Sequence, residues 1–66
     1  MKKYYKTELI EDFRKVNKLN IKQFCKLCKI SEWVYYKIIN QHLNLRSSNI
    51  FKIAREMNIA MSELYY

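Results

Sequence analysis

The sequence predicts an all-α domain, and three observations support this prediction. The 66 residues include no glycine and no proline, so tight hairpins, which normally need glycine at positive φ, are disfavoured. Apolar residues recur three or four positions apart along most of the chain, as they do on one face of a helix. Asparagine and serine, which favour helix ends, stand between the apolar stretches. We therefore expect a compact domain of four to five helices.

The first helix is expected to begin at Thr7, whose hydroxyl is a candidate cap. Leu9, Phe13 and Val16 recur at i, i+4 and i+7, and Ile10 widens this apolar stripe. Acidic side chains stand near the start of the stripe and basic ones near its end, which suits the helix dipole. The basic residues before Thr7 form a short N-terminal arm, so we divide the chain into an arm at 1–6 and a domain at 7–66.

Residues 20–42 have the pattern of two short helices joined by a tight turn. Asn20 is a natural N-cap, and Gln23 can return a bond to its backbone, as in a capping box. Ser31 is a second N-cap, with Glu32 in the first turn of its helix. Two capped helices this close must cross steeply. That is the helix-turn-helix arrangement, whose second helix can enter a DNA major groove.

Both helices of this pair have an apolar face. The inward residues are Ile21, Phe24, Cys25 and Cys28 in the first helix, and Val34, Tyr35, Ile38 and Ile39 in the second. Two cysteines three positions apart on an apolar helix face indicate core residues rather than a disulfide. His42 is the only histidine, so a four-ligand zinc site is not expected, and we predict no metal and no cofactor.

A fourth helix is expected after a polar connection, with Ser47 or Ser48 as its cap. Its apolar set is Ile50, Ile53, Ala54 and Met57, with Phe51 to one side. Asn58 is a good stop because asparagine tolerates the left-handed conformation better than most residues. A last short turn over residues 62–66 should direct Leu64 inward.

The formal net charge of +7 favours a polyanionic partner, most often nucleic acid. A basic solvated surface without such a role, or an acidic membrane surface, would also suit this charge. The sequence lacks a Cys-His or Ser-His arrangement, a glycine-rich phosphate loop and a carboxylate cluster, so we do not expect an enzyme. Unpaired thiols, with neither a signal peptide nor a spanning segment in the pattern, lead us to expect a cytoplasmic protein.

The segment from Ile53 to Leu64 carries the clearest resemblance to a known family. Its sequence, Ile-Ala-Arg-Glu-Met-Asn-Ile-Ala-Met-Ser-Glu-Leu, is similar to the closing phrase of the lambda-repressor-like, Cro-type (XRE) helix-turn-helix family. Ile30-Ser31 match the turn of that family, and Cys25 stands in place of its small alanine. The resemblance covers residues 8 to 64. It implies a lambda-repressor-like DNA-binding fold with its helix-turn-helix pair at about 20–42, and a transcriptional regulator, in particular a repressor.

The resemblance also implies which residues meet double-stranded DNA. Base reading would fall to the outward residues of the helix at 31–41, namely Glu32, Trp33, Tyr36 and Lys37. Phosphate contacts would come from Lys22, Lys26, Lys29, Asn40 and Arg46, to which Lys2 and Lys3 of the arm could add. A weak homodimer would use Met61, Tyr65 and Tyr66. Two plainer interpretations remain: Trp33 can cover the edge of a small core, and Glu32 can act only on the helix dipole.

Two other functions are compatible with the same fold. One is a protein-interaction module, such as an antirepressor or an adaptor. Ile21, where many family members carry a phosphate-binding glutamine, and the outward Trp33 and Tyr36 favour it. The other is the antitoxin of a toxin–antitoxin pair, which would add an apolar surface for its toxin. The net charge favours DNA over both.

Overall fold

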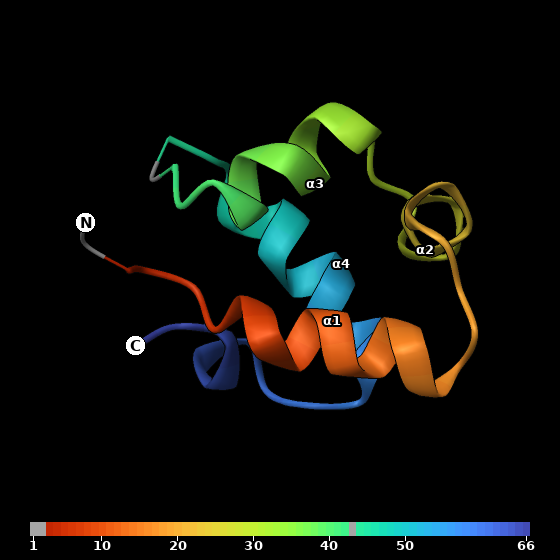
Figure 1. The fold of residues 1–66 in the computed structure, drawn as a ribbon. Coiled ribbons are helices and arrows are strands. Elements are labelled where there is room, and N and C mark those ends of the chain that lie inside the picture. Colours follow the sequence, from red (N-terminus) through yellow and green to blue (C-terminus); the bar gives the residue numbers. More distant parts are fainter. Residues whose placement is uncertain (1–2, 43) are drawn as a thin grey trace.

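The structure is a computed structural model that describes residues 3–42 and 44–66. Met1, Lys2 and Leu43 lie outside the described residues, so the predicted role of Lys2 lies outside them as well. The described parts contain the α-helices α1 (Thr7–Val16), α2 (Ile21–Cys28), α3 (Glu32–Ile39) and α4 (Ser47–Met57), and the 3-10 helix η1 (Met61–Leu64). The all-α prediction is confirmed, including the short fifth helix (Figure 1).

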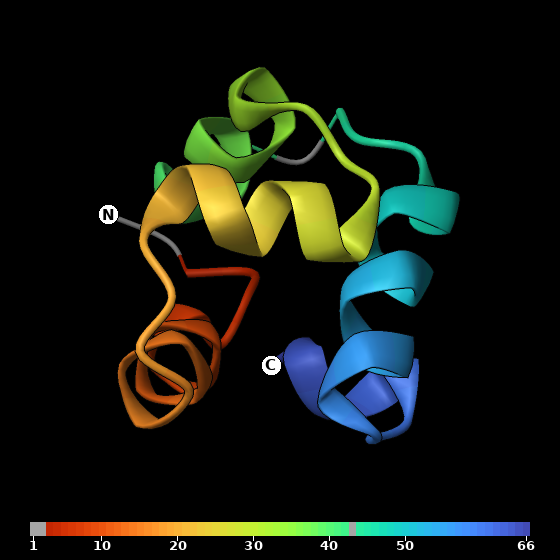
Figure 2. The ribbon, with the colours of Figure 1, turned by 90° about the vertical axis from the view of Figure 1, so that its right-hand side faces the viewer.

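The helices α2 and α3 cross steeply. In Figure 1, α2 is seen end-on while α3 runs across the view. In Figure 2, turned by 90°, α2 lies across the view and α3 is seen nearly along its axis. Among the helices of the described residues, none lies over the outer side of α3 in either view.

The predicted caps of α2 and α3 are confirmed. The Asn20 side chain accepts a hydrogen bond from the backbone N–H of Gln23 at 2.7 Å, and Gln23 Oε1 accepts one from the N–H of Asn20 at 2.9 Å. Ser31 Oγ accepts from the N–H of Val34 at 3.2 Å. The reciprocal pair at α2 and the single bond at α3 satisfy donors that a helix start leaves free.

The predicted caps of α1 and α4 are wrong. Thr7 is already the first residue of α1, and the position before it is occupied by Lys6, which makes no side-chain cap bond. Ser47 and Ser48 likewise lie inside α4, after Arg46. In both helices the first turn extends one residue earlier than the hydroxyl that sequence alone selects.

All four α-helices end in the same way although the chain has no glycine. A residue at positive φ follows each helix, and these residues are Lys18, Lys29, Gln41 and Asn58. In each case the N–H of this residue donates to the carbonyl three residues back, and the next N–H donates to the carbonyl five residues back. This is the Schellman motif, which normally places glycine at the left-handed position. The predicted stop at Asn58 is confirmed.

The residue after the left-handed position differs among these ends. After α1, α2 and α4 it is Leu19, Ile30 and Ile59, and each is packed partly buried against the core. An apolar contact at this place commonly accompanies the motif. After α3 it is His42, which is exposed. The end of α3 therefore lacks the apolar contact that accompanies the other three helix ends.

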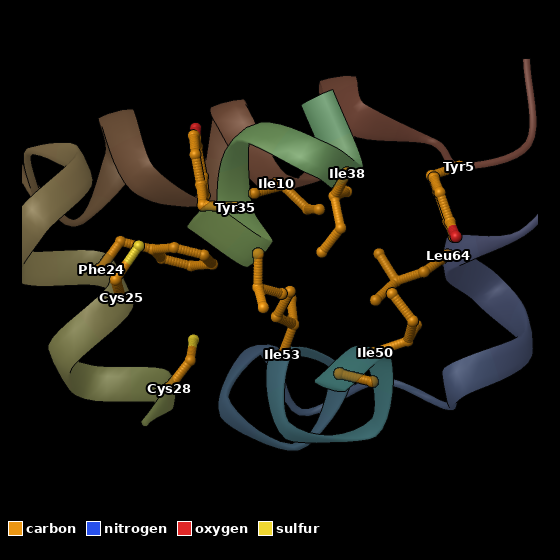
Figure 3. Packing of buried hydrophobic residues seen from close by; sticks show 12 residues of the cluster. Tyr5, Ile10, Phe24, Cys25, Cys28, Tyr35, Ile38, Ile50, Ile53 and Leu64 are labelled. Atoms are coloured by element: carbon orange, nitrogen blue, oxygen red, sulfur yellow. The ribbon is translucent and has the colours of Figure 1, made fainter. Parts of the chain in front are cut away.

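The core draws side chains from every helix. Figure 3 shows Ile10, Phe24, Ile38, Ile53 and Leu64 converging between the helices, and each is at most 1% exposed. Phe24 makes edge contacts with Phe13 and Tyr35, with ring centroids 6.1 and 5.8 Å apart. Edge-to-face geometry of this kind adds to the burial of apolar area.

The apolar face of α1 is centred on a different residue from the one predicted. Ile10, which was expected at the edge of the stripe, is the buried residue of α1. Val16 is 80% exposed and Leu9 is 36% exposed, while Phe13 is half-buried. The i, i+4, i+7 pattern allows two neighbouring faces, and packing of α1 on the rest of the domain selects the one centred on Ile10.

Residues 3–6, here called the N-terminal segment, pack into the domain through Tyr5, which differs from the expectation of a separate basic arm. Tyr5 is only 2% exposed, and it forms an isolated antiparallel bridge with Tyr65. The N–H of Lys6 donates to the carbonyl of Leu64 at 2.8 Å, and the N–H of Tyr66 donates to that of Tyr4 at 3.1 Å. Residues 4–6 and 64–66 thus run side by side on one edge of the molecule (Figure 1).

Candidate nucleic-acid interface

The helix α3 has one buried face and one exposed face. Val34, Tyr35 and Ile38 are buried in the core. Trp33 is 64% exposed and Tyr36 is 48% exposed, and Glu32 is exposed as well. The outward positions anticipated for these residues are where the structure places them, and Lys37 is half-buried beside them. Whether they read bases remains a prediction.

Trp33 and Lys37 contact each other on this face. Lys37 Nζ lies 5.0 Å from the centroid of the Trp33 ring, in a cation–π arrangement. The two residues are one helical turn apart, so α3 itself sets this pairing. Tyr36 is braced by an edge contact with the buried Tyr35, with centroids 5.7 Å apart. The face therefore offers an aromatic surface with an ammonium group held over it.

The candidate phosphate ligands are all exposed. Lys22, Lys26 and Lys29 follow one another at intervals of four and three residues along α2 and its end, so they share a face. Lys29 also occupies the left-handed position directly before the turn into α3. Asn40 follows the last residue of α3, and Arg46 precedes α4. Basic and amide groups thus flank α3 at both of its ends.

The two cysteines are buried and free. Burial raises the pKa of the Cys28 thiol to about 12, and the Glu56 carboxylate adds to the shift. Burial also raises the pKa of the Cys25 thiol, with a smaller contribution from Glu32. Thiols held neutral in this way are poor nucleophiles and poor metal ligands, as expected for core residues. Within residues 3–42 and 44–66, no group of three or more candidate ligands gathers to hold a metal ion.

The candidate dimer residues differ in how free they are. Met61 and Tyr65 are half-buried, and the Tyr65 ring stacks obliquely on Tyr5 with centroids 5.5 Å apart. Tyr66 is 63% exposed, although its hydroxyl donates to Glu8 Oε1 at 3.2 Å. Tyr66 is thus the one of the three with most of its surface available for a partner.

Sequence reasoning missed Gln41, which makes the longest-range side-chain contacts around α3. Its amide bonds the backbone of Tyr4 and Tyr5, 37 and 36 residues away. One local sign was present in the sequence. The residue after Gln41 is His42, whereas the equivalent residue after each other α-helix is apolar, so the end of α3 lacks the usual apolar contact.

Comparison of the chain with protein-family models, curated proteins and solved structures finds no match. The resemblance to the Cro-type family therefore remains an interpretation of the sequence. Among the described residues, no helix is long and apolar enough to cross a membrane.

Proposed function

We propose that this chain is a sequence-specific, double-stranded DNA-binding transcriptional regulator, acting as a repressor, that reads the major groove with α3. The observation that carries the proposal is the division of α3. Its inner face anchors the helix in the core, while Glu32, Trp33 and Tyr36 are exposed to solvent. A helix that is fixed on one face and free on the other can enter a groove as a rigid element.

The charge of the chain supports the same proposal. A net charge of +7 on 66 residues attracts DNA at long range and supplies several phosphate contacts. Lys22, Lys26 and Lys29 on one side of α3, and Arg46 beyond its other end, are exposed and free to approach the two strands that border a groove.

The outward residues of α3 supply the base-reading chemistry. Lys37 can donate to O6 or N7 of guanine, and Glu32 can accept from N4 of cytosine. The Trp33 ring can pack on a thymine methyl group, and the Tyr36 hydroxyl can donate to a phosphate. Because Lys37 lies over the Trp33 ring in the free protein, it must leave or share that position to reach a base. Two copies would place their α3 helices about 34 Å apart on one face of the duplex.

A protein-interaction module is the second candidate function, and one observation favours it. Two aromatic residues of α3 are exposed, Trp33 at 64% and Tyr36 at 48%. Tryptophan and tyrosine are enriched in the centres of protein interfaces. An antirepressor, an adaptor or an antitoxin would use this face for a protein partner.

Salt dependence separates the two functions. We would titrate the protein into fluorescently labelled random-sequence duplex at low and moderate salt, and follow anisotropy together with Trp33 emission. DNA binding through several phosphates should weaken steeply as salt rises, and Trp33 emission should change. An absence of binding at low salt by a folded, helical protein would reject the DNA proposal and favour a protein partner, since an apolar contact does not depend on phosphates.

Two variants then test the assignment of residues, with an operator selected from a pool of sequences. Lys37→Ala should reduce the preference for the selected site, while Lys26→Ala should weaken all sequences alike and lower the salt slope by about 1. If neither variant changed DNA affinity, the site assignment would be wrong even if the chain binds DNA.

A further inference from the structure

The end of α3 is held by a residue whose backbone conformation suits glycine. Gln41 lies in the left-handed region with φ of 62°, where a Cβ atom is disfavoured. Its N–H donates to the carbonyl of Ile38 at 3.0 Å, and the N–H of His42 donates to that of Lys37 at 2.9 Å. Glycine at position 41 would close this motif with less strain. The glutamine side chain is therefore the feature that needs an explanation.

That side chain binds the N-terminal segment as a neighbouring strand would. Gln41 Oε1 accepts hydrogen bonds from the N–H groups of Tyr4 at 2.7 Å and Tyr5 at 2.9 Å. Gln41 Nε2 donates to the carbonyl of Tyr5 at 3.0 Å. The Tyr5 hydroxyl in turn donates to the carbonyl of His42 at 2.9 Å. Gln41 and His42, just beyond the end of α3, thus hold residues 4 and 5 by four hydrogen bonds.

The opposite side of the segment is held by the C-terminal residues. The N–H of Lys6 donates to Leu64, the N–H of Tyr66 donates to Tyr4, and the Lys6 ammonium lies 5.7 Å from the Tyr66 ring centroid. The N-terminal segment is therefore fixed on both sides. Lys3, which is exposed, lies one peptide bond from a nitrogen that Gln41 holds.

We propose that Gln41 is a positioning residue that holds Lys3 beside the C-terminal end of α3, so that Lys3 contacts a DNA phosphate when α3 is in the groove. This inference rests on the proposed function. Its ligand is the phosphodiester backbone next to the groove that α3 reads, on the side of Asn40 and Arg46. A lysine whose neighbouring backbone is already held loses less conformational freedom on binding than one on a free arm, so more of its attraction to phosphate appears as affinity.

The hydrogen bonds from the Gln41 side chain to Tyr4 and Tyr5 can be tested on the protein alone with Gln41→Gly. Glycine suits the left-handed backbone, so α3 should keep its end while the side-chain bonds are lost. Amide hydrogen exchange by NMR should show reduced protection at Tyr4 and Tyr5, with Phe24 and Val34 unchanged. Lys29→Gly is the matched control because Lys29 occupies the equivalent position after α2. Equal protection of Tyr4 and Tyr5 in Gln41→Gly and the wild type would overturn the inference.

A double-mutant cycle on DNA tests the positioning itself. In the wild-type background, Lys3→Ala should weaken binding several-fold and lower the salt slope by about 1. In the Gln41→Gly background the same change should have a smaller effect, since the backbone next to Lys3 has lost its bonds to Gln41 and is held by the C-terminal residues and the Tyr5 hydroxyl alone. Lys22→Ala, in α2, should cost the same in both backgrounds. Equal effects of Lys3→Ala in the two backgrounds would overturn the positioning role alone. A wild type that binds no duplex at low salt would instead reject the proposed function, and with it the DNA role of Lys3.

Discussion

The ends of α2 and α3 have the same backbone geometry but are stabilised differently. Both have a left-handed residue that is not glycine, Lys29 at φ of 60° and Gln41 at 62°. At the end of α2 the Lys29 side chain is exposed, and the next residue, Ile30, packs against the core. At the end of α3 the next residue, His42, is exposed, and the Gln41 side chain binds the N-terminal segment.

This difference shows two ways to offset the same local cost. A left-handed residue with a Cβ atom is disfavoured by about 1–2 kcal/mol relative to its right-handed form. After α2 the burial of one apolar neighbour offsets this cost locally, within a few residues. After α3 the offset comes from contacts 36 and 37 residues away, so the end of α3 depends on the N-terminal segment being in place.

The largest expected effect on stability comes from truncating Tyr5, whose backbone and hydroxyl bind the residues at the end of α3. Tyr5→Ala should lower the free energy of unfolding by about 3 kcal/mol, because it empties a buried aromatic site beside Tyr65. Tyr5→Phe is the control: it keeps the ring and loses only the hydrogen bond to His42, so it should cost about 1 kcal/mol. Urea unfolding followed by circular dichroism measures both. Equal losses from the two variants would mean that the ring adds nothing, and that the N-terminal segment is not part of the core.

The next effect compares the two left-handed positions directly. Lys29→Gly should stabilise the protein by roughly 1 kcal/mol, since it relieves the left-handed backbone and, because the Lys29 side chain is exposed, loses little packing. Gln41→Gly relieves the same strain but loses three hydrogen bonds, each contributing about 0.5–1.5 kcal/mol, so its net effect should be a loss of about 2 kcal/mol. Unfolding in urea should show the opposite signs. Stabilisation by both substitutions would mean that the Gln41 bonds contribute little.

The sequence was sufficient at three helix boundaries where the determining interactions are local, although the equally local signals at Thr7 and Ser47 misplaced the caps of α1 and α4. The caps at Asn20 and Ser31 and the stop at Asn58 depend on a side chain or a backbone tolerance within a few residues, and each is confirmed. The outward positions of Trp33 and Tyr36 follow from helical periodicity with four inward partners on the same short helix. Their roles toward DNA remain predictions, because a groove-facing residue and a merely exposed one follow the same period.

The sequence was insufficient where distant segments decide the outcome. The burial of Tyr5 depends on Tyr65 and His42, neither of which is near it in the chain. The choice of Ile10 over Leu9 as the centre of α1 depends on how α1 is rotated against the other helices. A basic, aromatic start to the chain is typical of a free arm, and only the tertiary contacts of Gln41 show that it is held.

The smallest expected effect is a pH dependence of stability that arises from the last residue of α2 and has no counterpart at the last residue of α3. The last residue of α2 is Cys28, whose thiol pKa burial raises to about 12, whereas α3 ends on Ile39, which does not titrate. A thiol with a raised pKa in the folded state stabilises the fold fully below its unfolded pKa of about 8.5–9, and this stability is lost as the pH rises toward 12. At a pH of about 9.5 the loss should be roughly 1 kcal/mol or less.

The measurement is urea unfolding of the wild type and of Cys28→Ala at neutral pH and at a pH of about 9.5. The alanine variant should be less stable at neutral pH, because it leaves a small cavity, but its stability should fall less as the pH rises. Burial also raises the pKa of Cys25, Tyr5 and Tyr35, so some loss at alkaline pH should remain in both proteins. Parallel pH profiles would show that Cys28 titrates alike in the folded and unfolded states. That result would mean that water reaches the Cys28 thiol in the folded protein. The packing at the end of α2 would then be looser than the burial of Cys28 indicates.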